Sequence, residues 1–132
     1  MIVEDTTGEI VSWCSDALDA DLGDRVWRAW GIVRDQRLAG AAVLHNARRY
    51  DMELSMCGTV TRGLVKVIAS AVREANVGRL SVQIRRTSFL RRHLPRLGFT
   101  FEGVTRHYYG PARENDALRY GILTSEWEAR HG

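Results

Sequence analysis

Residues 56–63 have the composition of an anion-binding turn. The run Met56-Cys57-Gly58-Thr59-Val60-Thr61-Arg62-Gly63 follows residues 50–56, which alternate as a strand does, and precedes a helical repeat at 61–75. A glycine-containing turn between a strand and a helix offers backbone N–H groups and the positive end of the helix dipole to an anion. The pattern predicts a diphosphate site, although glycine is also common in strand-to-helix turns that bind nothing.

Glu53 is the candidate for acid–base chemistry. On the predicted strand, Met52, Leu54 and Met56 form an apolar face, so Glu53 points the other way. A carboxylate in this place can act as a general base toward an amine, or it can be a surface charge on a half-exposed strand. Further titratable side chains, each of which also fits a loop or rim position, are His45, His107, Tyr108 and Tyr109.

Arginines are concentrated in the segment 85–96, which suggests an anionic partner on that side of the chain. They are Arg85, Arg86, Arg91, Arg92 and Arg96. The same residues can also form a solvated helix face. Nucleic acid is disfavoured as the partner, because the net charge of +3 is modest and Phe89 is the single aromatic residue of the segment.

The elements that must position these residues alternate between sheet and helix. The predicted strands are 26–33, 38–45, 50–56, 79–84, 99–107 and 117–123, and the predicted helices are 9–18, 61–75, 87–94 and 125–130. The polar connections 34–37 and 46–49 are of hairpin length, so the strands they join should be antiparallel. The helix capped by Thr61 should make a right-handed crossover between two parallel strands.

The short helix after residue 84 is predicted to begin at Thr87 as its N-cap. Pro95 should end it by Leu94, or tighten it into a 3₁₀ turn through Leu97, because proline disfavours helical angles in the residue before it. The polar segments 19–24 and 110–116 are predicted loops.

Composition describes one globular domain of 132 residues, with 45% hydrophobic and 27% charged side chains. No apolar stretch approaches the ~20 residues of a membrane span, and the acidic start MIVEDTTGEI lacks the features of a signal peptide. We therefore expect a cytoplasmic protein without a membrane partner. Cys14 and Cys57 are expected to be free thiols, and no spacing of Cys and His predicts a metal site.

The segment Arg79–Gly103, RLSVQIRRTSFLRRHLPRLGFTFEG, reads as a strand, a basic turn, a short helix and a strand opened by Leu97-Gly98-Phe99. This order resembles the C-terminal half of the GCN5-related N-acetyltransferases (GNAT family), especially the branch that acetylates the N-termini of proteins such as ribosomal proteins. The compact chain is also similar to small phage-encoded members.

The signature of that family at the start of its cofactor-binding helix is Gln/Arg-x-x-Gly-x-Gly/Ala. The matching run is Ser55-Met56-Cys57-Gly58-Thr59-Val60, in which Gly58 fits the central glycine while Ser55 and Val60 depart. A second register places Thr61-Arg62-Gly63 at the phosphates instead.

The resemblance implies an α+β fold, with a mixed α/β sheet whose antiparallel N-terminal strands are joined by a β-α-β crossover to a C-terminal β-α-β-β unit. A single domain would span 1–132. Its N-terminal region would be shortened, because one helix is visible where the family commonly has a strand and two helices.

The resemblance further implies an enzyme, an acetyl-CoA-dependent N-acetyltransferase in which a primary amine attacks the thioester directly. Glu53 would be the general base, and the backbone N–H groups of 54–56 would polarise the acetyl carbonyl. The implied cofactor-binding residues are Leu54, Ser55, Met56, Gly58, Thr59, Val60, Thr61, Arg62, Gly63, Thr87 and Arg91. The acceptor stays open between a protein N-terminus, a lysine and a small amine.

A catalytically degenerate protein of the same fold, serving binding or assembly, is the alternative. It is favoured by Ser55, Val60 and Leu90, which replace residues that contact the cofactor in the family. Relatives are often dimers, so Trp127 could bury at a homodimer interface or pack on its own sheet.

Overall fold

The computed structural model describes residues 1–22, 25–112 and 116–132. Its strands form one seven-stranded sheet in the order β1-β2-β3-β4-β5-β7-β6. The strands are β1 (Ile2–Glu4), β2 (Val26–Arg34), β3 (Arg37–His45), β4 (Asp51–Gly58), β5 (Arg79–Arg85), β6 (Thr100–Thr105) and β7 (Ala117–Leu123). The helices are α1 (Glu9–Leu18), α2 (Arg62–Glu74), α3 (Leu90–Leu97) and α4 (Thr124–His131). No helix in the described part of the chain is both long and apolar enough to cross a bilayer.

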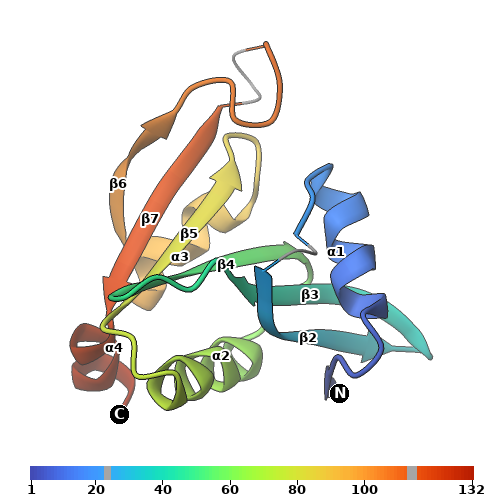
Figure 1. Ribbon diagram of the computed structural model, residues 1–132, viewed down its shortest axis with the longest axis horizontal. Helices are drawn as coiled ribbons and strands as arrows, with labels where there is room; N and C mark the ends of the chain where they lie inside the picture. Colours follow the sequence, from blue (N-terminus) through green and yellow to red (C-terminus); the bar gives the residue numbers. More distant parts are fainter. Residues whose placement is uncertain (23–24, 113–115) are drawn as a thin grey trace.

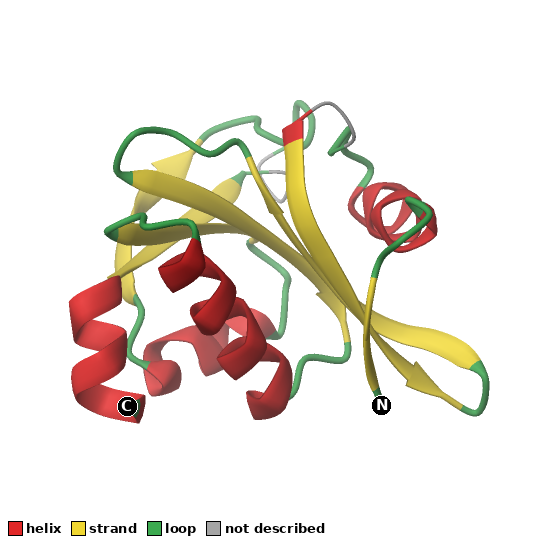
Figure 2. Cartoon of the chain, turned by 60° about the horizontal axis from the view of Figure 1, so that its bottom comes forward, coloured by secondary structure: helices red, strands yellow, loops and turns green. Residues whose placement is uncertain are grey.

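The helices cover the sheet unequally, with α2, α3 and α4 on one face and α1 on the other (Figures 1 and 2). The period-two pattern of β4 produces this arrangement. Met52, Leu54 and Met56 are buried among the residues of α2 and α3, whereas Cys57 packs with α1. The predicted α+β fold is therefore confirmed.

The sheet is divided at the junction of β4 and β5. These strands are parallel, as the crossover through α2 requires, but they pair only from Asp51↔Arg79 to Leu54↔Val82. Beyond that point β4 continues to Gly58 and β5 to Arg85, and the two diverge (Figure 1). An opening in the sheet follows from this divergence.

The face under α1 holds the two cysteines, which are buried free thiols as predicted. Cys57 at the end of β4 and Cys14 of α1 share a hydrogen bond, with the two sulfurs 3.2 Å apart. This hydrogen bond and burial raise the pKa of the Cys14 thiol.

The N-terminal region differs from the prediction, because a strand, β1, precedes the helix. β1 pairs antiparallel with β2 from Ile2↔Ile32 to Glu4↔Trp30. Three residues hold too little of the alternating pattern to be recognised in a sequence. The predicted loops 19–24 and 110–116 lie partly outside the described residues, at 23–24 and 113–115.

The first hairpin is tighter than the predicted connection 34–37. Arg34 pairs with Arg37, so the turn consists of Asp35 and Gln36 alone. Both residues have positive φ values, 50° and 64°, which is the geometry of a type I′ turn. The strand predicted at 99–107 is shorter as well, since β6 ends at Thr105.

The prediction that Thr87 caps α3 was wrong. The helix begins at Leu90, whose N–H donates to the Ser88 hydroxyl at 3.2 Å, and Thr87 precedes it in a turn. Pro95 does not stop the helix, which reaches Leu97. Proline removes one hydrogen bond of this short helix, while Leu90 and Leu94 anchor it by packing in the core.

Candidate active site

A groove of about 210 Å³ lies between the N-terminus of α2 and α3, on the helix-covered face of the sheet. Its lining residues are Met56, Val60, Thr61, Arg62, Val65, Phe89, Leu90, His93, Leu94, Arg96 and Leu97. The groove thus has an apolar floor, to which β4 contributes Met56. Two arginines, Arg62 and Arg96, give it a cationic rim.

The start of α2 supplies the polar end of this groove. Thr61 is the N-cap, as predicted, and its hydroxyl accepts a hydrogen bond from the Leu64 N–H at 3.3 Å. The first turn contains Arg62 and no acidic residue, although a helix N-terminus favours negative charge. The N–H groups of Arg62 and Gly63 have no hydrogen-bond partner within the described residues, so the helix end is open to an anion.

Gly58 and Thr59 are occupied in holding the turn itself. Gly58 has φ +67°, and a Cβ there would lie 2.3 Å from the Ala39 carbonyl oxygen, so glycine is required for close contact with β3. The Thr59 N–H donates to that same oxygen at 2.8 Å. Thr59 therefore has no free N–H for a phosphate. Met56 and Val60 of the first register and Thr61 and Arg62 of the second line the groove.

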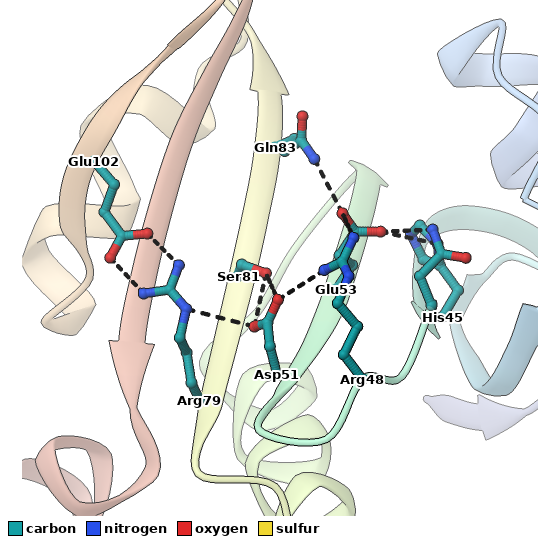
Figure 3. A network of polar contacts seen from close by, with 9 residues as sticks. His45, Arg48, Asp51, Glu53, Arg79, Ser81, Gln83 and Glu102 are labelled. Atoms are coloured by element: carbon teal, nitrogen blue, oxygen red, sulfur yellow. Dashed lines mark hydrogen bonds and ion pairs between the residues drawn. The ribbon is translucent and has the colours of Figure 1, made fainter.

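The opposite face of the sheet carries a polar cavity of about 490 Å³. It is lined by Asn46, Arg48, Asp51, Glu53, Arg79, Ser81, Val82, Gln83, Glu102, Thr105, Tyr108 and Arg119. Most of these residues belong to the network in Figure 3, which runs from Glu102 through Arg79 and Asp51 toward Glu53. The cavity therefore suits a polar, charged ligand.

Glu53 is held in this cavity by residues from two segments, the loop 46–50 and β5. Its carboxylate accepts hydrogen bonds from Asn46 Nδ2 at 2.6 Å, Gln83 Nε2 at 3.2 Å and Arg48 Nη2 at 3.4 Å (Figure 3). The side chain is 12% exposed, and His45 Nδ1 lies 3.8 Å from Oε2. A carboxylate so fixed at a cavity wall has the placement of a general base.

His45 lies behind Glu53 and is a structural neighbour rather than a rim residue. It is buried, and its Nε2 is 2.8 Å from the Ser55 hydroxyl oxygen. Burial lowers the pKa of His45 below its ordinary value, and the Glu53 charge opposes this effect only in part. The imidazole is therefore neutral at neutral pH.

Two tyrosines, Tyr108 and Tyr109, line a small pocket together with Leu18 of α1, and Tyr108 also lines the polar cavity. The Tyr109 hydroxyl donates to the Gln83 main-chain carbonyl at 3.4 Å, and burial raises the pKa of Tyr109 to about 12. Burial also raises the pKa of Tyr108, which lines the cavity beside Glu53. His107 does not line it; its N–H donates to Asp116 at 2.9 Å.

β4 connects the two sites through adjacent residues. Met56 lines the groove, while Leu54 and Ser55 line a small pocket of about 20 Å³ that Glu53 and Gln83 share. Because successive strand residues face opposite sides of a sheet, the groove and the cavity lie on opposite faces of β4, beside the point where β4 and β5 diverge.

Two of the sequence-predicted cofactor-binding residues lie away from the groove. Thr87 and Arg91 are exposed, and neither lines the groove. Sequence reasoning missed Phe89 and His93 as groove residues. Arg96 belongs to the arginine cluster named above. Which arginines of that cluster face the groove depends on the orientation of α3, which the sequence does not give.

No family model matches this chain, and no curated protein matches it significantly in sequence. Solved structures do match. The ribosomal-protein-S18-alanine N-acetyltransferase from Escherichia coli has a TM-score of 0.66 and 15% identity, covering 94% of this chain and 93% of that one. The ribosomal-protein-alanine N-acetyltransferase from Brucella melitensis has a TM-score of 0.66 and 18% identity, covering 93% and 99%.

A GNAT family acetyltransferase from Elizabethkingia anophelis, solved with acetyl-CoA bound, has a TM-score of 0.71 and 11% identity, covering 93% of this chain and 97% of that one. At such identities the likeness concerns the backbone, and it extends over nearly the whole of both chains. The chain therefore has the fold of the GCN5-related N-acetyltransferases.

Proposed function

We propose that this protein is an acetyl-CoA-dependent N-acetyltransferase that acts on a primary amine. One observation supports this above the others: a groove with a cationic rim and a cavity containing Glu53 lie on opposite faces of β4, beside the point where β4 and β5 separate. A two-substrate transfer needs such an arrangement, in which each substrate enters from its own side.

The groove residues fit coenzyme A in chemistry. The open N-terminus of α2, with Thr61, Arg62 and Gly63, suits the diphosphate, and Arg96 suits a further phosphate. The apolar floor, including Met56 and Val60, suits the pantetheine arm. Thr87 and Arg91 stay predictions as cofactor contacts, as do Gly58 and Thr59.

Acetyl-CoA would supply an acetyl group activated as a thioester. Glu53 would take the proton that the amine nitrogen loses as it bonds to the acetyl carbon, and the departing sulfur would finally be protonated as the thiol. Backbone N–H groups of 54–56 that face the opening would stabilise the developing negative charge on the acetyl oxygen.

A second candidate is a binding protein of the same fold without catalysis. The Thr59 N–H is already bonded to Ala39, and Ser55 and Val60 depart from the family signature. The acceptor's identity, a cytoplasmic location, a homodimer, and kinship with phage-encoded or N-terminal-acetylating proteins stay predictions. Trp127 is buried against Phe99 of its own chain, so it is not available to a partner.

Calorimetry and a coenzyme A release assay test the proposal together. We expect micromolar binding of acetyl-CoA, and turnover with at least one member of a panel of primary amines and peptides with free N-termini. Glu53→Gln should lower kcat/KM by about 100-fold or more while leaving acetyl-CoA affinity unchanged.

Glu9→Gln, which neutralises an exposed carboxylate on α1, is the matched control and should behave as the wild type. Absence of binding at millimolar acetyl-CoA would exclude the proposed function. Normal binding without turnover on any amine would favour the non-catalytic candidate.

A further inference from the structure

Gln83 occupies the position where the two half-sheets separate. It is the first residue of β5 beyond the last pair with β4, Leu54↔Val82. Its side chain lines both the polar cavity and the small pocket beside Ser55, and it lies next to Glu53 in Figure 3. Glu53 and Tyr108 are the other residues common to both spaces.

The orientation of the Gln83 amide is fixed by its neighbour. The Glu53 carboxylate only accepts hydrogen bonds, so the amide nitrogen must face it, at 3.2 Å. The amide oxygen, Oε1, is consequently turned away from Glu53. This oxygen is buried and has no hydrogen-bond partner within the described residues.

Nearby hydroxyl donors are used elsewhere. The Ser81 hydroxyl donates to Asp51, with both carboxylate oxygens at 2.9 Å. The Tyr109 hydroxyl donates to the main-chain carbonyl of Gln83 and not to its side chain. A buried carbonyl oxygen without a donor destabilises a folded protein, so a ligand donor is a physical reason for its presence beside a cavity.

We propose that Gln83 Oε1 binds the acceptor by accepting a hydrogen bond from the second N–H of a primary amine, whose first N–H faces Glu53. This inference rests on the proposed function and makes it narrower. A neutral primary amine has two N–H donors and one lone pair, so both acceptors are satisfied while the lone pair stays free to attack. A secondary amine or an alcohol has one donor and leaves Gln83 unpaired.

The acceptor test compares variants of Gln83 on matched peptides. The probes are a hexapeptide with a free N-terminal alanine and tryptamine, each beside its N-methylated form. Wild type should prefer the primary over the N-methylated amine by at least about tenfold in kcat/KM, because a polar site rejects an analogue that leaves it unpaired. Gln83→Met, similar in length but without an acceptor, should raise the amine KM by about tenfold and abolish that preference.

Gln83→Asn retains both the acceptor oxygen and the amide nitrogen on a side chain one methylene shorter, and it should restore more of the preference than Gln83→Met does. The control is Thr105→Val, which removes a hydroxyl from the same cavity that no described residue bonds. It should leave the preference intact. Acetyl-CoA affinity should be the same in all four proteins.

A second measurement needs no acceptor and separates this inference from the proposed function. Because Gln83→Met also removes the hydrogen bond from Nε2 to Glu53, it is measured in a Glu53→Leu background, where that nitrogen has already lost its acceptor. If Oε1 is unpaired in the free protein, adding Gln83→Met there should leave the unfolding temperature of Glu53→Leu unchanged or raise it by a few degrees. A clear fall in the unfolding temperature would show that Gln83 is structural and would overturn the inference. Equal use of primary and N-methylated amines by wild type would overturn it too, whereas no turnover on any amine would count against the proposed function alone.

Discussion

At the scale of single residues, the polar face of β4 gathers partners from distant parts of the chain. Alternation along the strand was enough to predict that Glu53 faces away from the core. It could not predict the groups that orient the carboxylate, because Asn46 and Arg48 come from a loop and Gln83 lies thirty residues away. The alternation along a strand determines which face a side chain points to, and the topology of the sheet determines which residues that side chain contacts.

His45 gives a pH-dependent prediction at this scale. Its pKa is lowered by burial, with Glu53 raising and Arg48 lowering it by their charges, so the folded chain resists protonation. The unfolded chain binds a proton below about pH 6.5, where the folded chain does not. Stability should therefore be fully present above that pH and fall as the pH drops toward the folded pKa, by up to about 1.4 kcal/mol per pH unit.

Urea unfolding at pH 7.5 and 5.5 measures this effect. His45→Gln keeps a polar group near Ser55 but does not titrate, so the wild type should lose more stability between the two pH values than the variant. The same pH dependence in both proteins would contradict the assignment of a neutral buried imidazole.

At the scale of elements, the ends of α2 and α3 show when a cap can be predicted. Thr61 and Thr87 both precede a helical pattern, yet only Thr61 is a cap. Near Thr87 the chain first makes a turn, in which the Ser88 N–H donates to the Arg85 carbonyl at 2.9 Å, and this turn delays the helix to Leu90. The sequence shows that a residue able to cap a helix is present, but the path of the backbone determines at which residue the helix begins.

Substituting both threonines tests this difference. Thr61→Ala should lower the free energy of unfolding by about 1 kcal/mol, because the Leu64 N–H loses its acceptor. Thr87→Ala should change it by less than about 0.5 kcal/mol, since its exposed hydroxyl makes no hydrogen bond with the described residues. Urea denaturation measures both, and equal losses would contradict the cap assignment.

At the scale of the whole molecule, the sheet consists of two halves joined by the short β4–β5 pairing. The parallel crossover was predictable from the order of strands and the helix between them. The residue at which β4 and β5 stop pairing was not predictable, because it depends on how strongly each half of the sheet twists. The groove takes residues from both sides of this division, Val60 to Val65 from one and Phe89 to Leu97 from the other.

A ligand that contacts both sides of the groove should stabilise the fold as a whole. At 100 times its dissociation constant, acetyl-CoA should add about 2.7 kcal/mol and raise the unfolding temperature by about 10 °C. S-acetyl-N-acetylcysteamine, which has the thioester but no diphosphate, should have little effect at the same concentration. A thermal scan distinguishes them, and equal shifts would contradict a role for the α2 N-terminus.

The limited pairing of β4 with β5 also has a mechanical consequence. Residues 55–58 extend about 13 Å past the last paired residue, Leu54, at roughly 3.3 Å per residue. A rotation of about 5° between the half-sheets, pivoting there, would displace the end of β4 by about 1 Å, a distance that matters to reacting atoms. Side chains buried at this pivot, such as Val82, therefore set the resting angle between the two half-sheets through their volume.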